Sequence, residues 1–413
     1  MLVGEIIRYY REKKGISQSK LVEGICSKAY LSRFEGGKVD FSPETISKLS
    51  ERLSININKE IESFKRIQSR LRDWEYSIVM LNSSLIKEIK LELEKMPMIN
   101  SSNHAAYYFL LTARYYLYQK MLPETKNTIE YVEKNYPTLS NYEKNLLLHI
   151  KGMYFLNTFR TTESEGSLTA VKILKQINIE EYNNEEYYYH LALAYHYANA
   201  KVQAYSNADL ALQFFNKTYN YVNAINAQTL MLMQFESGND IDFLGLINKY
   251  KDLIHTSEVV GAYENQLVLL NNIGEEFYNK EEYEQAAKFF EQSLILTNNA
   301  SIDYLRRFYQ YIEACMEGNL LENKKLIEKI DKGIKLAEKQ CPILSTLFTL
   351  LSLKSKNNLN QYFNFLADVA LPLFKSTNND TYYEQYGKKL YSHYLDLKQY
   401  KKAVELAQNL RQI

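Results

Sequence analysis

Glycine and proline are scarce in this sequence. Its 413 residues include 14 glycines and 6 prolines, well below the average usage of about 7% and 5%. Sheet-rich folds need many tight turns, which these two residues commonly supply. The scarcity argues against a β-sandwich, barrel or propeller, and it predicts an all-α chain of long helices with short connections.

Cysteine is also rare, and long apolar runs are absent. Cys26, Cys315 and Cys341 are far apart and odd in number, so neither a disulfide framework nor a cysteine zinc site is expected. No apolar run approaches the roughly 18 residues of a membrane-spanning helix, and the N-terminal residues lack the apolar core of a signal peptide. We therefore expect a soluble, cytoplasmic protein without a membrane partner.

The sequence contains none of the common catalytic motifs. There is no glycine-rich phosphate loop, no His-Glu-x-x-His and no Gly-x-Ser-x-Gly. Of the six histidines, His190 and His196 are near each other, but six residues apart they do not share a helix face. We accordingly expect no catalytic residues, no metal and no cofactor.

Basic charge is concentrated at the N-terminal end. Residues 1–72 carry 15 Lys and Arg against 9 Asp and Glu, whereas the rest of the chain carries 35 against 40. The net charge of +1 hides this asymmetry. A basic end on a mildly acidic body indicates that this end alone binds a polyanion such as DNA.

Helix start and stop signals follow one another closely between residues 4 and 57. Serines stand where N-caps are needed, and glycines follow the basic last turns. The expected elements are a helix over 4–14 closed by Gly15, a second helix capped by Ser17, a third over 28–35 between Ser27 and Gly36, and a fourth that begins at Ser42-Pro43.

This region resembles the lambda-repressor-like helix-turn-helix family. The pattern consists of Arg11-x-x-x-Gly15-Ile16-Ser17-Gln18, Leu21, Leu31-Ser32-x-Phe34-Glu35-x-Gly37 and Pro43. The turn before the third helix is one residue shorter than usual, which is similar to the PlcR and NprR group. The resemblance implies that 1–57 is a DNA-binding domain in which Arg11 and Glu35 tie the first helix to the third.

The third helix of this domain has two faces. Leu31 and Phe34 face the small core, so the opposite face is free to enter the major groove of DNA. The family resemblance implies a phosphate contact for Gln18, and Arg33 points sideways, toward a backbone phosphate. Alternatively, the basic side chains are merely solvated and Ser27 acts only as a cap. The candidate DNA-binding residues are Gln18, Ser27, Lys28, Ser32 and Arg33.

Helical repeats follow the head. Residues 58–72 form a charged, uninterrupted stretch that is expected to be a linker helix. In the body, 73–413, the segment Leu267–Ala300 matches the 34-residue tetratricopeptide pattern, with small Gly274 and Ala286 where two helices approach closely. About eight or nine helix pairs fit, and such a stack forms a right-handed solenoid with a concave face. Further copies are expected at Ala106–Leu139, around Gly152 and Phe155, and at 187–219, 304–338 and 382–410.

The first helix of each pair lines the concave face, where a peptide would bind. Asn272 falls where peptide-binding repeats often place an asparagine, whose amide donates to a peptide C=O and accepts from its N–H. The alternative is that these residues are ordinary solvated side chains. The candidate peptide-binding residues are Arg114, Asn271, Asn272, Glu275, Tyr278, Arg306, Tyr309, Gln310 and Glu313.

Over nearly its whole length the chain resembles the peptide-pheromone receptors of the Rgg, Rap, NprR, PlcR and PrgX family. The resemblance implies a quorum-sensing regulator that is switched by a short signalling peptide and binds a palindromic operator as a homodimer. An alternative is a Rap-like protein-interaction regulator that acts on a sporulation phosphorelay protein and has a secondary or vestigial head. A phosphatase-like enzyme is the weakest interpretation.

Overall fold

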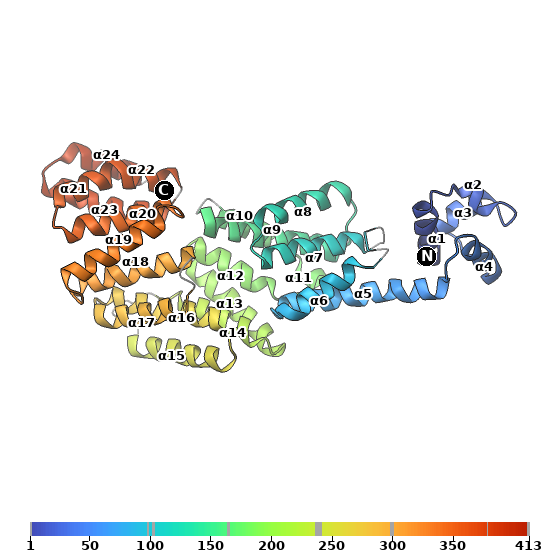
Figure 1. Ribbon diagram of the computed structural model, residues 1–413, viewed down its shortest axis with the longest axis horizontal. Coiled ribbons are helices and arrows are strands. Elements are labelled where there is room, and N and C mark those ends of the chain that lie inside the picture. Colours follow the sequence, from blue (N-terminus) through green and yellow to red (C-terminus); the bar gives the residue numbers. More distant parts are fainter. Residues whose placement is uncertain are drawn as a thin grey trace. The chain divides into compact units, whose positions relative to one another are not determined.

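The computed structural model describes residues 2–96, 99–100, 104–162, 166–235, 242–297, 301–377 and 379–410. Within these ranges every regular element is a helix (Figure 1). The chain divides into two compact units, Met1–Tyr154 with Gln176–Asn183, and Phe155–Lys175 with Asn184–Ile413. The predicted domain boundaries at residues 57 and 72 separate the DNA-binding head, the linker helix and the peptide-binding array. These boundaries stay a prediction.

The first unit contains the head and the first repeats. Helix α9 continues beyond it, because Phe155 and the residues after it belong to the second unit. The helices are α1 (Leu2–Lys13), α2 (Gln18–Val22), α3 (Lys28–Glu35), α4 (Pro43–Arg52), α5 (Ile57–Val79), α6 (Ser83–Glu94), α7 (Ala105–Tyr118), α8 (Leu122–Asn135), α9 (Asn141–Thr162) and α11 (Ile179–Tyr182).

The second unit contains the remaining repeats. Its helices are α10 (Gly166–Leu174), α12 (Tyr187–Tyr197), α13 (Lys201–Lys217), α14 (Tyr221–Leu232), α15 (Phe243–Val259), α16 (Tyr263–Asn279), α17 (Tyr283–Ile295), α18 (Ile302–Glu317), α19 (Asn323–Ala337), α20 (Pro342–Ser355), α21 (Leu359–Phe365), the π-helix η1 (Leu366–Ala370), α22 (Leu371–Ser376), α23 (Asp380–Asp396) and α24 (Tyr400–Leu410).

The head folds around a small apolar core. Gly15 and Gly24 adopt positive φ angles of 62° and 71°, a conformation that glycine adopts without steric cost, and so they end α1 and turn the chain between α2 and α3. The third helix has the predicted bounds, from Lys28 to Glu35. The core is formed by Ile7, Leu21, Val22, Leu31, Phe34, Phe41, Leu49 and Leu53.

The connecting helix α5 is anchored at several points. The hydroxyl of Tyr10 on α1 donates to Glu60 Oε2 at 2.7 Å. Further along α5, the indole of the fully buried Trp74 donates to Ile86 O at 3.1 Å, and Arg70 Nη2 pairs with Glu92 Oε2 at 2.6 Å. The predicted linker 58–72 is thus part of one 23-residue helix that also packs on α6.

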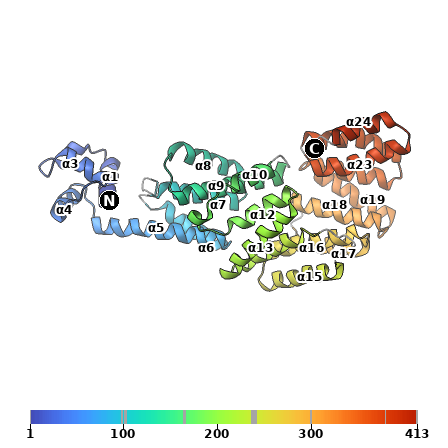
Figure 2. The ribbon, with the colours of Figure 1, turned by 180° about the vertical axis from the view of Figure 1, so that it is seen from behind.

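Helix pairs of tetratricopeptide type make up the array, and this confirms the predicted fold class. In the segment around Leu267–Ala300, α16 packs on α17, and a methyl group at Gly274 would lie 2.6 Å from the Phe290 ring. The view from behind in Figure 2 shows α16 beside α17 and α18 beside α19. The turns use Glu281 and Asn319 at positive φ in place of glycine.

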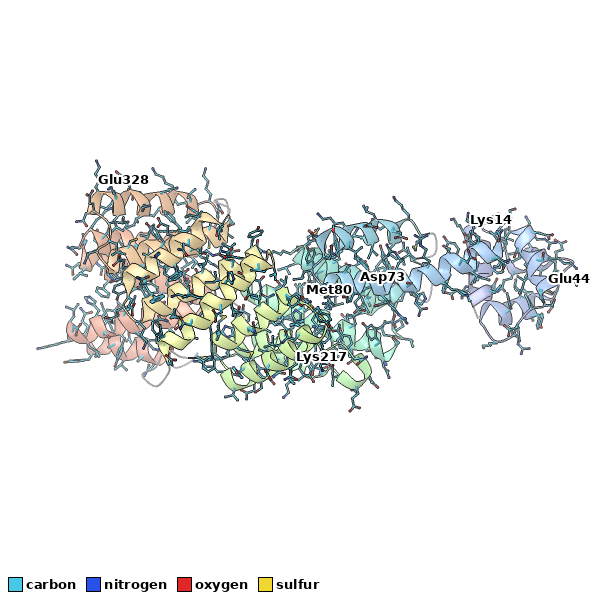
Figure 3. The ribbon with its side chains drawn as sticks, turned by 90° about the horizontal axis from the view of Figure 1, so that it is seen from below. Lys14, Glu44, Asp73, Met80, Lys217 and Glu328 are labelled. Atoms are coloured by element: carbon cyan, nitrogen blue, oxygen red, sulfur yellow. The ribbon has the colours of Figure 1, made fainter. Side chains whose placement is uncertain are left out.

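The array helices alternate between buried and exposed faces. On α19, Leu326 and Ile330 are buried four residues apart, while Glu328 between them is exposed, as expected for the 3.6-residue period. Figure 3 shows Glu328 on the outer side of its helix, and Lys217 at the end of α13 is exposed in the same way. Charged side chains such as these therefore stay in solvent, while the apolar residues of the same helix join the core.

Candidate functional site

Helix α3 presents a polar, exposed face in the head. Ser27 caps the helix by accepting a hydrogen bond from the backbone N–H of Tyr30 at 3.2 Å. Lys28, Ser32 and Arg33 are exposed, and their helix is held by its buried opposite face. Lysine and arginine donors on an exposed recognition helix are suited to base edges and phosphates.

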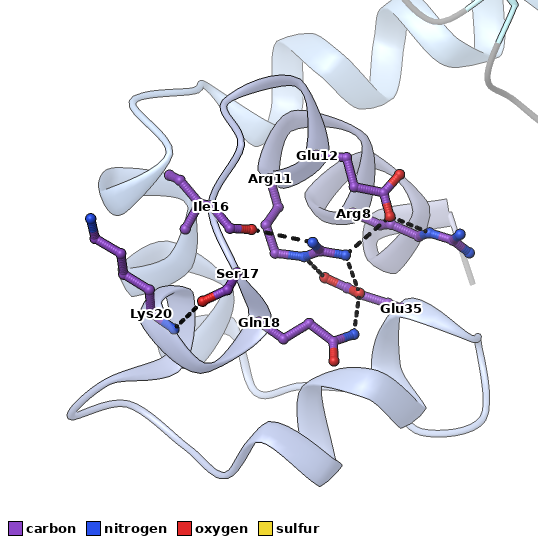
Figure 4. A network of polar contacts seen from close by, with 8 residues as sticks. All are labelled: Arg8, Arg11, Glu12, Ile16, Ser17, Gln18, Lys20 and Glu35. Atoms are coloured by element: carbon purple, nitrogen blue, oxygen red, sulfur yellow. Dashed lines mark hydrogen bonds and ion pairs between the residues drawn. The ribbon is translucent and has the colours of Figure 1, made fainter.

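A buried ion pair fixes this helix to α1 (Figure 4). Arg11 Nε donates to Glu35 Oε1 at 2.6 Å, and its Nη2 donates to Glu35 Oε2 at 2.9 Å. The hydrogen bond that Arg11 donates to Glu35 is the main reason why the pKa of Arg11 rises above its usual value. This bidentate geometry confirms the predicted tie between the first and third helices.

Gln18 belongs to the same network. Its side-chain amide donates to Glu35 Oε2 at 2.8 Å, so it helps to hold α2 against α3 (Figure 4). The phosphate contact expected of Gln18 stays a prediction. Sequence reasoning overlooked Arg52, whose Nη1 donates to Leu21 O at 2.9 Å and to Glu23 O at 2.7 Å. These bonds satisfy carbonyl groups at the end of α2, where the turn begins.

A cavity of about 650 Å³ lies within the second unit. Most of its walls come from α16 and α18, and α23 supplies a further wall. Eight of the nine predicted peptide-binding residues line it: Asn271, Asn272, Glu275, Tyr278, Arg306, Tyr309, Gln310 and Glu313. Sequence reasoning overlooked Val268, Phe290, Asp303, Arg307, Asn379, Tyr382 and Gln385, which also line the cavity.

Arg114, the ninth predicted residue, lies elsewhere. It is on α7 in the first unit and is buried, with 2% of its surface exposed. Burial raises the pKa of Tyr142 on α9, and the positive charge of Arg114 opposes this shift. Arg114 therefore does not join the other eight residues at the cavity, and its part in peptide binding stays a prediction.

Hydrogen bonds order the floor of the cavity. Glu275 Oε1 accepts from Asn271 Nδ2 at 2.8 Å and from Gln310 Nε2 at 2.6 Å, so it joins α16 to α18. The hydroxyl of Tyr309 donates to Glu313 Oε1 at 3.0 Å and lies 2.9 Å from the hydroxyl of Tyr386 on α23. These contacts hold polar side chains from three helices in fixed orientations.

Three buried amide atoms at this cavity lack a hydrogen-bond partner among the described residues. They are Oδ1 of Asn271, Nδ2 of Asn272 and Nδ2 of Asn379. Leaving a buried donor or acceptor unpaired costs about 1–3 kcal/mol, and a ligand with matching groups would recover this cost. A peptide backbone carries both a C=O acceptor and an N–H donor at each ordinary residue.

Both signs of charge are present at the cavity. Desolvation by the surrounding protein raises the pKa of the Glu275 and Glu313 carboxyl groups. Desolvation also lowers the pKa of Arg307, whose Nη1 donates to Thr297 Oγ1 at 3.1 Å. The cavity is thus suited to a polar ligand with charged groups.

The structure contains a helix-turn-helix head and an array of tetratricopeptide-type helix pairs that holds a polar cavity. The chain thus belongs to the class of proteins that combine a helix-turn-helix head with a helical-repeat array. Residues 7–59 match the helix-turn-helix family model. None of the described helices has both the length and the apolar character needed to span a membrane.

Two known proteins are similar to the chain over most of its length. It is 22% identical over 404 residues to the transcriptional activator NprA of Geobacillus stearothermophilus. The aligned residues cover 93% of this chain and 96% of that protein. Its fold is similar to the apo form of the quorum sensor NprR from B. thuringiensis, with a TM-score of 0.67 and 22% identity over 84% of this chain and 98% of that chain.

A Rap protein complexed with the competence and sporulation factor also has a similar fold. The TM-score is 0.65, with 16% identity over 84% of this chain and 97% of that chain. Together, these similarities confirm the resemblance to NprR and Rap proteins that the sequence indicated.

Proposed function

We propose that this protein is a quorum-sensing transcriptional regulator whose DNA binding is switched by a short peptide held in the cavity of α16, α18 and α23. The observation that carries the peptide part is the set of buried amide atoms at Asn271, Asn272 and Asn379 that lack partners among the described residues. An asparagine amide both donates and accepts hydrogen bonds, so it holds an extended peptide backbone regardless of the side chains of the peptide.

The known relatives support both parts of this proposal. NprA is a transcriptional activator, and NprR has been solved in complex with its cognate peptide NprX, in a form that matches this chain with a TM-score of 0.66. The head supplies the DNA-binding part through the exposed side chains of α3, and the buried pair of Arg11 and Glu35 keeps that helix in place.

DNA is bound by a homodimer in this proposal. The DNA-facing residues are Ser27, Lys28, Ser32 and Arg33, with Gln18 at the start of α2. One small head offers few contacts, whereas two heads bind half-sites about 34–36 Å apart, one helical turn of DNA. The operator is therefore two-fold symmetric. In this proposal the protein acts in the cytoplasm and catalyses no reaction.

The experiment for the DNA part uses the full chain and a pool of random duplexes. The bound fraction is sequenced after several rounds of selection. The proposal predicts two inverted half-sites and an affinity that falls steeply with salt, because neutralised phosphates release counterions. A single unpaired half-site, or an affinity independent of salt, contradicts it.

A second candidate function is regulation through protein contact by the array. The observation that favours it is the fold similarity to the Rap protein, with a TM-score of 0.65. In that case the partner would be a protein such as a sporulation phosphorelay component, and the head would be secondary. If the head is vestigial, the duplex selection separates the two candidates, because such a head enriches no sequence.

A further inference from the structure

Two carboxyl groups at the cavity form no ion pair with any residue that the structure describes. Glu275 on α16 is exposed to the cavity, and Glu313 on α18 is half-buried. Among the described residues, neither carboxylate has a lysine, arginine or histidine nitrogen within 4.0 Å, whereas nearby Glu317 pairs with Lys354. A carboxylate that is partly removed from water is stable only with compensating partners.

The hydrogen bonds of Glu275 orient it toward the cavity. Both donors, Asn271 Nδ2 and Gln310 Nε2, act on the same oxygen, Oε1. These bonds hold the carboxyl group in place, and the side chain keeps exposed surface for a ligand. Neutral amide donors orient the charge without neutralising it. When the carboxyl group is ionised, its negative charge is therefore available to a ligand.

Helix geometry brings the second carboxyl group to the same part of the cavity. The bond between Gln310 and Glu275 fixes the register of α18 against α16. Glu313 is three residues beyond Gln310, which is about one helical turn, or roughly 5 Å. Its charge acts on Tyr278, three residues beyond Glu275, and helps to raise the pKa of that hydroxyl. The two carboxylates thus form one acidic region on neighbouring helices.

The basic groups around the cavity leave this region negative. Lys389 on α23 lies over the Tyr386 ring, 4.8 Å from its centroid, and Lys354 on α20 pairs with Glu317, so both act on Glu313 only at longer range. Arg306 is one turn before Gln310, in the opposite direction along α18. A cation that arrives with the ligand would be the first to contact both carboxylates directly.

We propose that Glu275 and Glu313 make the cavity selective for peptides with a cationic group, either a lysine or arginine side chain or a free amino terminus. This inference rests on the proposed peptide-binding function. The asparagine amides hold any backbone, so they provide affinity without sequence preference. The two carboxylates add the preference, because a charge-assisted hydrogen bond forms only with a cationic group.

The test uses synthetic heptapeptide libraries of random sequence. The immobilised full chain is incubated with one library that has free amino termini and a second that is N-acetylated, and mass spectrometry identifies the retained peptides. We expect lysine and arginine to be retained about tenfold or more over glutamate and aspartate, as a charge-assisted hydrogen bond predicts. If the library with free amino termini is retained about tenfold or more over the acetylated one, without enrichment of lysine or arginine, the cation is the amino terminus.

Matched variants assign the preference to the two carboxylates. Glu275→Gln combined with Glu313→Gln keeps the shape of the side chains, and it should reduce the enrichment of basic residues to near unity. Glu284→Gln, on the exposed side of α17 outside the cavity, makes a charge change of the same kind and should leave the enrichment unchanged. Circular dichroism confirms that each variant is folded.

The outcomes separate the two proposals. If the wild type retains both libraries equally and without enrichment of basic residues, or if the double variant keeps the wild-type preference, the acidic selectivity is wrong and peptide binding stands. If the wild type retains no peptides from either library, the proposed peptide-binding function fails, and the selectivity fails with it.

Discussion

Replacing Asn272 by alanine should weaken peptide binding without destabilising the fold. Asn272 is buried, with 9% of its surface exposed, and its Nδ2 has no hydrogen-bond partner among the described residues. Removing an unpaired buried donor relieves about 1–3 kcal/mol, and the lost packing of the side chain offsets part of this gain. We expect the free energy of unfolding to stay within about 1 kcal/mol of the wild type.

The peptide complex should respond in the opposite way. In the complex the Asn272 amide pairs with the peptide backbone, so its loss costs about 1–3 kcal/mol of binding free energy. This corresponds to an increase of roughly 5-fold to 150-fold in Kd. Calorimetric titration of a peptide retained from the library measures the change in affinity, and urea unfolding measures the change in stability.

Asn265 provides a matched control on the same helix. It is buried to a similar extent, with 7% of its surface exposed, but its Nδ2 donates to Val222 O at 3.1 Å and to Asn226 Oδ1 at 2.9 Å. Asn265→Ala should therefore lose about 1–3 kcal/mol of stability. If Asn272→Ala destabilises the protein as strongly, or binds peptide as tightly as the wild type, the role assigned to Asn272 is wrong.

Three further predictions concern the head and the acidic region. Lys28→Ala should reduce discrimination between DNA sites by about 1–3 kcal/mol, whereas Arg33→Ala should weaken all sites equally; equal effects on specific and random DNA in filter binding would contradict this division. Glu35→Gln should lower the thermal midpoint of the head by weakening its buried pair with Arg11, which is worth about 3–5 kcal/mol when broken outright; an unchanged melting curve would refute it. Because burial raises the pKa of Glu275, its negative charge is fully present only above that raised pKa and is lost as the pH falls through it, so the preference for a lysine peptide over its glutamine analogue should shrink as the pH is lowered; a pH-independent ratio of Kd values would contradict it.

Local signals made the head predictable from sequence. An N-cap side chain bonds a backbone N–H only three residues further on. Ser27 and the glycine after Glu35 were therefore sufficient to predict the bounds of the third helix. The partner of Gln18 was harder to predict, because Glu35 lies 17 residues away. A polar side chain takes whichever partner the tertiary fold brings near, and the spacing of caps carries no information about that choice.

The cavity was predictable only in part. The repeat pattern of α16 identified the face that carries Asn272 and Glu275, and equivalent positions on α18 followed from it. Asn379 and Tyr382 lie about 100 residues further on, at a repeat copy with a weak pattern, and no local signal connects them to this cavity. Arg114 is the opposite case, a predicted residue that does not line the cavity. Its position in the repeat indicates a face of the helix, but not whether neighbouring helices cover that face.

The proposed function requires that peptide and DNA binding are coupled in one molecule. Linkage requires that if peptide changes the affinity for DNA by some factor, DNA changes the affinity for peptide by the same factor. The direct measurement is calorimetric titration of a retained peptide into the full chain, with and without its selected operator, together with DNA titration with and without that peptide. The account predicts two equal ratios that differ from one; peptide affinity that is the same with and without operator would contradict the switch.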